Sequence, residues 1–206
     1  IADRVGALSG PKLAKEIADK KIAGTVIASS NQNLSSEIKS ILSSDTFKVF
    51  SSSDTQGVEL AGALKNIYAI CCGIAHAKNV GENALGFMVT RSMAEMSRFA
   101  VAKGANPITF LGLAGMGDLM ATCTSKLSRN FQLGELLGSD MSLNQAKDKV
   151  GQVAEGARTL EVVFLEAKKM NVTMPIVDSL YKILYKGSSS DELIQDLLDH
   201  PNEVDV

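Results

Sequence analysis

The stretch Gly57–Ala77, GVELAGALKNIYAICCGIAHA, decides how the chain is organised. Its apolar side chains recur with the 3.6-residue period of an α-helix, at Leu60, Leu64, Ile67, Cys71 and Ile74. The most apolar part, residues 67–77, is short against the roughly 20 residues that a helix needs to cross a bilayer. The pattern therefore predicts a long helix buried in a protein core, with no membrane insertion.

Downstream of this helix, no segment has a convincing strand pattern. Helical periodicity predicts helices over 83–103, 118–124, 130–137, 143–152, 156–170, 176–185 and 191–199, with a short helical segment opened by Asn106-Pro107. The apolar positions of the 83–103 helix are Phe87, Met88, Met96 and Phe99, which are expected to fill a core. Gly187 predicts a helix stop, and Ser189 with Glu192 predicts a capping box.

The residues upstream have a different pattern. Strands are predicted over 4–8, 24–30 and 47–50, and helices over 12–19 and 34–42. This is an α/β pattern, but three strands and two helices without a nucleotide fingerprint make an incomplete sheet. The sequence therefore predicts a mainly α protein in which a small α/β piece precedes a larger helical domain.

Charge and composition exclude several functions. The 206 residues carry a formal net charge of −2, which gives no support to nucleic-acid or anionic-membrane binding. The three cysteines, Cys71, Cys72 and Cys123, are odd in number and lack metal-ligand spacing, which fits a reducing cytoplasm. With only His76 and His200, an imidazole metal site or catalytic triad is not expected, and each histidine is expected to be structural or exposed.

The stretch Gly112–Asn130, GLAGMGDLMATCTSKLSRN, resembles a phosphate-binding loop at first sight. Gly112 and Gly117 have the spacing of a Walker loop, but Asp118 stands where that loop needs its lysine. Gly115 and Gly117 match two glycines of a dinucleotide fingerprint, but Met120 occupies the position of the third. The stretch is therefore neither loop, and its glycines are expected to form a tight turn before a helix.

Two polar positions in this framework could carry chemistry. Lys65, beside Asn66 in the apolar helix, either extends its ammonium to solvent or lies in a closed pocket, where it could transfer protons. Asp118 either caps a helix or points with Thr122, four residues on, into a cleft. The sequence pattern leaves both alternatives open.

The tripeptide Ser128-Arg129-Asn130 combines a hydroxyl, a guanidinium and an amide beside a predicted helix start. These are the donors that a phosphate monoester needs, although a capping serine followed by a solvated arginine would read the same. Glu155-Gly156 similarly reads as a helix start with an acid in its first turn. Together with Lys65 and Asp118, these positions suggest a pocket for a small phosphorylated alcohol or ketone.

In combination, the motifs resemble the NAD(P)-dependent glycerol-3-phosphate dehydrogenase family, and its bacterial form most closely. The similar segments are ELAGALKNIYAI (59–70), GENALGFMVTRSMAEM (81–96), FLGLAGMGDLMATCTSKLSRN (110–130), VAEGARTLE (153–161) and, upstream, LSGPKLAKE (8–16). The resemblance implies a helical substrate domain of the 6-phosphogluconate dehydrogenase type over 56–206. Residues 1–55 would be the end of a nucleotide-binding domain.

The resemblance also implies an activity and roles for individual residues. Glycerone phosphate and sn-glycerol 3-phosphate would interconvert with NAD or NADP as cofactor, for glycerophospholipid synthesis. Lys65 would transfer the proton. The implied substrate-binding residues are Gly10, Lys12, Lys65, Asn66, Asp118, Thr122, Ser128, Arg129 and Asn130. The implied cofactor-binding residues are Ala14, Arg129, Val153 and Glu155.

The sequence departs from the family pattern in two respects. Lys12 stands where the family usually has serine or threonine, and both the Gly-x-Gly-x-x-Gly fingerprint and a second family lysine are absent from these residues. The chain is therefore expected to be the C-terminal part of the enzyme and inactive alone. A non-catalytic helical interaction module, or a dehydrogenase for another small hydroxy compound, stays an alternative. A homodimer is compatible with the sequence.

Overall fold

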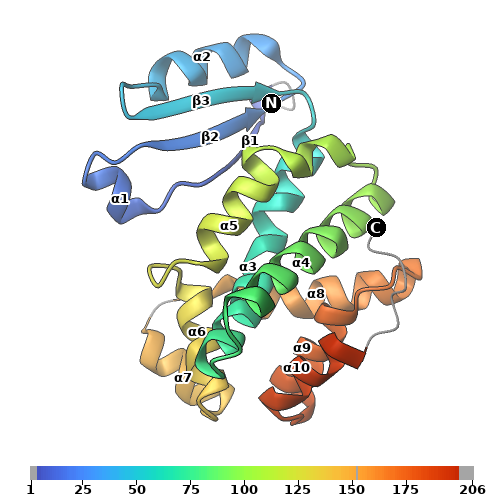
Figure 1. Cartoon of the computed structure of the whole chain (residues 1–206). Helices are drawn as coiled ribbons and strands as arrows, with labels where there is room; N and C mark the ends of the chain where they lie inside the picture. The colour runs from blue at the N-terminus through green and yellow to red at the C-terminus, as the bar shows by residue number, and fades with distance from the viewer. Residues whose placement is uncertain (1–3, 152, 200–206) are drawn as a thin grey trace.

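A small sheet lies against a larger array of helices in the computed structural model, which describes residues 4–151 and 153–199 (Figure 1). The sheet and two short helices come from the first fifty or so residues, and every later element of the described chain is helical. The prediction of a mainly α protein with a preceding α/β piece is confirmed.

The sheet has three strands in the order β1-β2-β3. They are β1 (Ala7–Ser9), β2 (Ala23–Ala28) and β3 (Phe47–Ser52), with α1 (Ala14–Ala18) and α2 (Gln32–Leu42) in the connections. β1 runs antiparallel to β2, with Ser9 opposite Val26, and β2 runs parallel to β3. The first strand begins later than the predicted 4–8. The helix predicted over 12–19 shortens to α1, in which no residue is buried, so little packing extends it.

Ten helical segments follow the sheet in the described chain. They are α3 (Thr55–Ala77), α4 (Glu82–Ala102), η2 (Pro107–Leu111), η3 (Leu113–Gly117), α5 (Asp118–Cys123), α6 (Arg129–Gly138), α7 (Leu143–Val150), α8 (Glu155–Met170), α9 (Pro175–Lys186) and α10 (Ser190–Asp199). The helix predicted over 143–152 ends at Val150, because Gly151 adopts a left-handed conformation with φ of 65°. Gln152 lies outside the described residues.

The core of the helical domain is built around α3, as its apolar period predicts. Residues 67–72 are completely buried. The helix α6 crosses α3 so closely that a side chain at Gly73 or Gly134 would clash with the other helix. A Cβ placed on Gly134 would lie 2.0 Å from the Ile70 carbonyl oxygen, so only glycine allows this approach. By length and composition α3 could cross a membrane, but 67% of its most apolar window is buried inside the fold, which is typical of a core helix.

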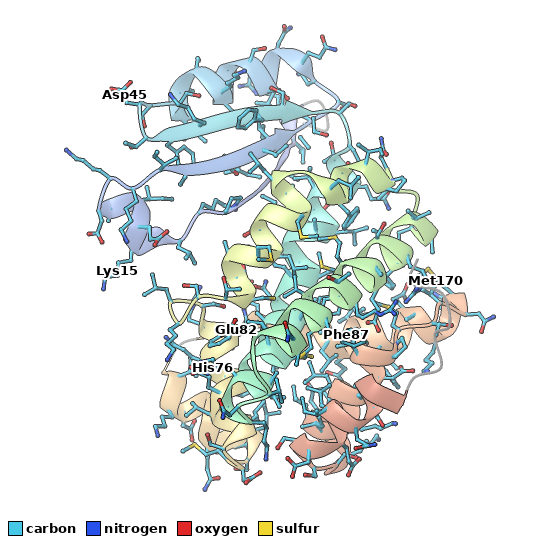
Figure 2. The ribbon with its side chains drawn as sticks, in the orientation of Figure 1. Lys15, Asp45, His76, Glu82, Phe87 and Met170 are labelled. Carbon is cyan, nitrogen blue, oxygen red and sulfur yellow. The ribbon has the colours of Figure 1, made fainter. Side chains whose placement is uncertain are left out.

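The methionines of α4 fill the core as predicted. Met88 and Met96 are buried with Phe99 in the main hydrophobic cluster. The expectation for Phe87, which Figure 2 labels on α4, is wrong, because this side chain is 41% exposed. Its ring instead carries the Arg91 guanidinium, whose central carbon lies 5.4 Å from the ring centre.

Two predicted helix ends agree with the structure in different degrees. Gly187 ends α9 in a left-handed conformation with φ of 79°, which confirms the stop. At the start of α10, Glu192 accepts a hydrogen bond from the Ser189 N–H, but the Ser189 hydroxyl accepts from the Asp191 N–H rather than from Glu192. The hydrogen bond from the Ser189 N–H to the Glu192 side chain is therefore the one expected of a capping box. The bond to the Ser189 hydroxyl comes from Asp191, one residue earlier than a capping box requires.

One buried carboxylate joins three helices of this core. Glu95 on α4 accepts hydrogen bonds from the Ile176 N–H at 2.6 Å, the Val177 N–H at 3.4 Å and the Tyr68 hydroxyl at 3.2 Å. It is 2% exposed and lies at the N-terminus of α9. Burial raises the pKa of Glu95 to about 7, against these hydrogen bonds, which lower it.

Glu95 should make stability fall as pH rises. The folded chain keeps this carboxyl protonated at pH values where the unfolded chain, with a pKa of 4.5, has lost the proton. Its stabilising contribution is therefore complete below pH 4.5 and is lost as pH rises toward 7. Between about pH 5 and pH 8, the native chain should lose up to roughly 3 kcal/mol in free energy of unfolding that the Glu95→Gln variant does not lose. Urea titrations of both proteins at both pH values measure this difference, and an equal change in the two proteins would contradict it.

Candidate active site

The centre of the candidate site is an ion pair between α3 and α5. The Lys65 Nζ lies 2.5 Å from the Asp118 Oδ1, and the two side chains are 16% and 3% exposed. Lys65 therefore does not extend its ammonium into bulk water, and the alternative of a closed, partnered lysine agrees with the structure. A lysine held this way presents a proton at a fixed place beside a cleft.

Asp118 opens α5, but its carboxylate does not cap that helix. The capping position belongs to Gly117, with no side-chain cap bond. The Asp118 Oδ2 instead accepts hydrogen bonds from the Ser9 hydroxyl and from the Gly10 N–H, both at 3.0 Å. Thr122 lies on the same face as predicted, and its hydroxyl donates to the Asp118 carbonyl oxygen at 2.6 Å. The carboxylate thus connects the sheet piece to the helical domain.

The glycines before Asp118 do not form the tight turn that the sequence suggests. Residues Leu113–Gly117 form a wide π-helical turn that runs straight into α5. Gly115 is needed there for a close approach, because a Cβ would lie 2.3 Å from the Phe110 carbonyl oxygen. Wide turns of this kind recur at functional sites, and here the turn sets where Asp118 begins its helix.

Most of the residues expected to bind substrate line a single cleft of about 520 Å³ beside Lys65. Its lining comprises Lys12, Leu13, Ala14, Lys15, Lys65, Asn66, Thr122, Leu127, Ser128, Arg129, Asn130, Gln132 and Val150. These residues come from α1, α3, α5, α6 and α7 and the loops between them, so the fold brings together positions far apart in the sequence. Asp118 lies behind Lys65, and Gly10 contacts Asp118 without lining the cleft.

The Asn130 amide holds three helices together at the floor of the cleft. Its Nδ2 donates to the Asn66 Oδ1 at 2.9 Å, and its Oδ1 accepts from the Gly156 N–H at 2.9 Å. Ser128 caps α6, with its hydroxyl accepting from the Phe131 N–H at 3.3 Å. Both side chains therefore have structural partners while they border the cleft, where the first turn of α6 also presents main-chain N–H groups.

Lys12 faces the same space from the sheet side. Among the described residues its ammonium makes no hydrogen bond or ion pair shorter than 4 Å, and burial lowers its pKa. Asp118 raises that pKa and Lys65 lowers it further. A partly buried cation without a protein partner, next to Lys65, favours an anion in the cleft.

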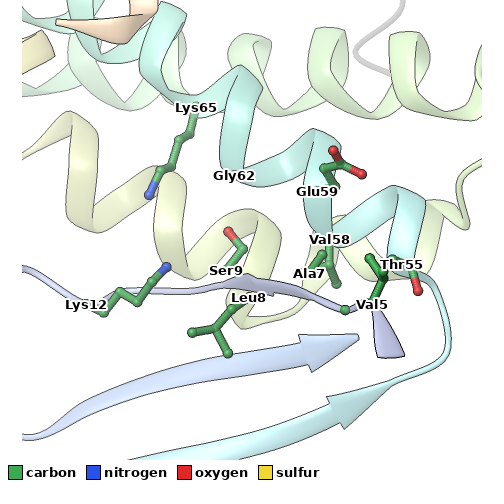
Figure 3. A pocket seen from close by; sticks show the side chains of 11 residues that line it. Val5, Ala7, Leu8, Ser9, Lys12, Thr55, Val58, Glu59, Gly62 and Lys65 are labelled. Carbon is green, nitrogen blue, oxygen red and sulfur yellow. The ribbon is translucent and has the colours of Figure 1, made fainter. Parts of the chain in front are cut away.

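A second cavity of about 340 Å³ lies on the other side of these lysines. β1 and the first turns of α3 form its walls, with Ser9, Glu59 and Gly62 among the lining residues. Lys12 and Lys65 border both cavities, and Figure 3 shows their ammonium groups directed toward one another to the left of Ser9. Lys65 is therefore accessible from two sides.

Two residues with an expected cofactor role are not part of this arrangement. Val153 is 73% exposed, Glu155 is the first residue of α8, and neither lines the two cavities. The three cysteines are buried and free, and the described residues contain no group of acidic, histidine or cysteine side chains that could hold a metal ion. His76 is partly exposed, with its Nδ1 3.0 Å from the Glu135 Oε1, and His200 lies outside the described residues.

Comparison with known proteins identifies the type of domain. Residues 54–195 match the family described as NAD-dependent glycerol-3-phosphate dehydrogenase C-terminus. The chain is 52% identical over 203 residues to glycerol-3-phosphate dehydrogenase (NAD(P)+) of Alcanivorax borkumensis and 48% identical to the protein of that name from Pseudomonas putida. Each match covers 98% of this chain and 59% or 60% of the relative, so the chain spans about three fifths of their length.

Solved structures give the same result. The structure of glycerol-3-phosphate dehydrogenase from Coxiella burnetii superimposes with a TM-score of 0.92 at 35% identity, over 94% of this chain and 60% of that one. The Plasmodium falciparum protein of that name has the same fold, with a TM-score of 0.85 at 23% identity over 97% of this chain and 57% of that one. The fold is that of the helical domain of these dehydrogenases. The chain belongs to the NAD-dependent glycerol-3-phosphate dehydrogenase family, and it matches the C-terminal region of the proteins in that family.

Proposed function

We propose that the chain supplies the substrate-binding and proton-transfer half of an oxidoreductase that interconverts glycerone phosphate and sn-glycerol 3-phosphate. The observation that carries the proposal is the arrangement of one cleft. Lys65, which the buried Asp118 carboxylate holds from behind, borders the same cleft as Arg129 at the start of α6. Membership of the dehydrogenase family supports this function over a non-catalytic interaction module.

The phosphate is assigned to the start of α6. Arg129 can donate two parallel hydrogen bonds to a phosphate monoester, and the first turn of the helix adds main-chain N–H groups and a favourable dipole. Ser128 and Asn130 border that place, and their structural hydrogen bonds keep it rigid. Gly10, Lys12, Asn66 and Thr122 complete the proposed substrate site, and a cationic Lys12 adds attraction for the dianion.

Lys65 then acts at the carbonyl end of the substrate. In the direction of reduction, its ammonium gives a proton to the carbonyl oxygen of glycerone phosphate, which becomes the hydroxyl of sn-glycerol 3-phosphate. In the reverse direction, neutral Lys65 takes the proton from that hydroxyl. Asp118 fixes the ammonium by the short ion pair and balances its charge inside the fold.

The residues of this chain fit a nicotinamide dinucleotide, NAD or NADP, as the second ligand. The Lys12 ammonium and the Arg129 guanidinium give the cleft positive charge suited to an anionic cofactor, and Ala14 borders the same cleft. When bound, the cofactor supplies or accepts the hydride. Val153 and Glu155, although outside the two cavities, flank the start of α8 and are retained as proposed cofactor contacts.

We further propose that residues 1–55 are the end of a nucleotide-binding domain and that residues 56–206 are the substrate domain. The change from sheet to helices at Thr55, where α3 begins, supports this boundary. A bacterial metabolic enzyme of this kind would work in the cytoplasm and supply sn-glycerol 3-phosphate for glycerophospholipids.

Turnover tests the proposal in a hybrid enzyme. In this hybrid, the matched region of the Alcanivorax borkumensis relative, which is 52% identical to this chain, is replaced by this chain. The rest of that relative is kept. We expect the hybrid to oxidise NADH or NADPH when glycerone phosphate is added and to form sn-glycerol 3-phosphate, with dihydroxyacetone a poor substrate. A folded hybrid that reduced unphosphorylated ketones equally well would contradict the substrate assignment.

A further inference from the structure

A chain of buried hydrogen bonds leads from the sheet to Lys65. The Thr25 hydroxyl on β2 donates to the Ser9 carbonyl oxygen at 3.0 Å, and the Ser9 hydroxyl donates to the Asp118 Oδ2 at 3.0 Å. The other oxygen of Asp118 holds Lys65. Thr25, Ser9 and Asp118 are 0%, 2% and 2% exposed, so water does not substitute for any of these partners.

The surroundings of Ser9 leave its hydroxyl little freedom. β1 ends at Ser9, which pairs with Val26 across the antiparallel ladder. On the other side, Gly62 of α3 faces the hydroxyl, and a Cβ at that position would lie 2.7 Å from the Ser9 Oγ. The absence of a side chain at Gly62 makes the space in which Ser9 reaches Asp118.

The two oxygens of Asp118 are thereby given different tasks. Oδ2 accepts from two neutral donors at the end of β1, Ser9 and Gly10, and Oδ1 faces the Lys65 ammonium. With Oδ2 held, the carboxylate cannot rotate to share both oxygens with the lysine. Each charge-assisted hydrogen bond of this kind fixes direction as well as adding stability.

We propose that Ser9 is a positioning residue for proton transfer: it orients Asp118, and through Asp118 it places the Lys65 ammonium between the two cavities. The expected effect on turnover rests on the proposed function. If Ser9 has this role, the end of β1 takes part in the proton transfer of the helical domain. Since the phosphate is assigned to α6, Ser9 should influence kcat and leave KM for glycerone phosphate nearly unchanged.

NMR spectroscopy tests the positioning without turnover. In the 206-residue chain labelled with ¹⁵N-lysine, the Lys65 ammonium held by Asp118 should give an NMR signal whose protons exchange slowly with water. The loss of this signal in Lys65→Met assigns it. We expect Ser9→Ala to broaden or remove that signal and Ser9→Thr, which keeps the hydroxyl, to restore it. Ser29→Ala is the matched control, because its buried hydroxyl donates to the Val5 carbonyl oxygen and does not contact Asp118.

The same variants in the hybrid enzyme test the consequence for catalysis. We expect Ser9→Ala to lower kcat about 10-fold, the order of one hydrogen bond to a charged group, with KM changed less than about 2-fold. Ser29→Ala should leave both constants unchanged. An intact Lys65 signal in Ser9→Ala would overturn the inference. A Ser9→Ala variant that lost only as much stability as Ser29→Ala and kept its kcat would overturn it as well. A hybrid without any turnover, together with a lost Lys65 signal, would refute the proposed function and leave the positioning supported.

Discussion

Replacing Lys65 with methionine should lower kcat for glycerone phosphate in the hybrid enzyme by about 10²–10⁴-fold, the contribution typical of general acid–base catalysis. Methionine keeps an apolar side chain of similar length and removes the ammonium group that we propose to carry the proton. KM should change little, because the phosphate contacts at α6 are untouched. Steady-state rates of NADH oxidation at saturating substrate measure the effect.

The Lys65 variant needs two controls, because it leaves Asp118 without its cation. The double variant Lys65→Met/Asp118→Asn removes the unpaired charge and keeps an oxygen for Ser9 and Gly10, so it should recover stability without recovering kcat. Lys168→Met removes an exposed lysine paired with Asp178 at 2.8 Å and should leave the rate unchanged. A Lys65→Met enzyme with nearly normal kcat would show that the lysine is only structural.

Arg129→Lys should reduce kcat/KM for glycerone phosphate by about 2 kcal/mol or more, the scale of a charged hydrogen bond. Lysine supplies the charge but not the planar pair of donors that a phosphate accepts. If the remote phosphate helps to align the carbonyl, kcat should fall while KM rises. Initial rates over a range of substrate concentrations separate the two constants.

Dihydroxyacetone, which has no phosphate, provides the control for Arg129. It should be a poor substrate for the hybrid enzyme, and Arg129→Lys should barely worsen it. Arg98→Lys is the matched variant, because Arg98 donates to the Thr173 carbonyl oxygen and lines neither cavity. Equal losses with both substrates would mean that Arg129 holds structure or cofactor rather than phosphate.

Local periodicity predicted most of the fold because it acts within one element. The apolar period from Leu60 to Ile74 predicts α3, because helical spacing and apolar composition agree along this helix. The same reasoning fails for Phe87, where a neighbouring arginine makes an exposed ring acceptable. It also fails at Gly115, because tight and wide turns use the same glycines and differ only in what packs against them.

The site could be predicted only in part, because its contacts join distant residues. Local pattern suggested Lys65 and Asp118 as candidates, but their ion pair depends on how α5 docks against α3. Ser9 was not suggested at all, since the hydrogen bond to Asp118 spans 109 positions in the sequence. A buried serine at a strand end opposite a glycine such as Gly62 becomes meaningful only when the packing is known.

A crystal structure of this chain with sn-glycerol 3-phosphate tests the central claim most directly, because it places both ends of the ligand at once. The phosphate should lie at the start of α6 within hydrogen-bonding distance of Arg129, and the C2 hydroxyl should face the Lys65 Nζ. Thr122 and Asn66 should border the ligand between these ends. A phosphate bound elsewhere, or a ligand whose C2 hydroxyl points away from Lys65, would contradict the account.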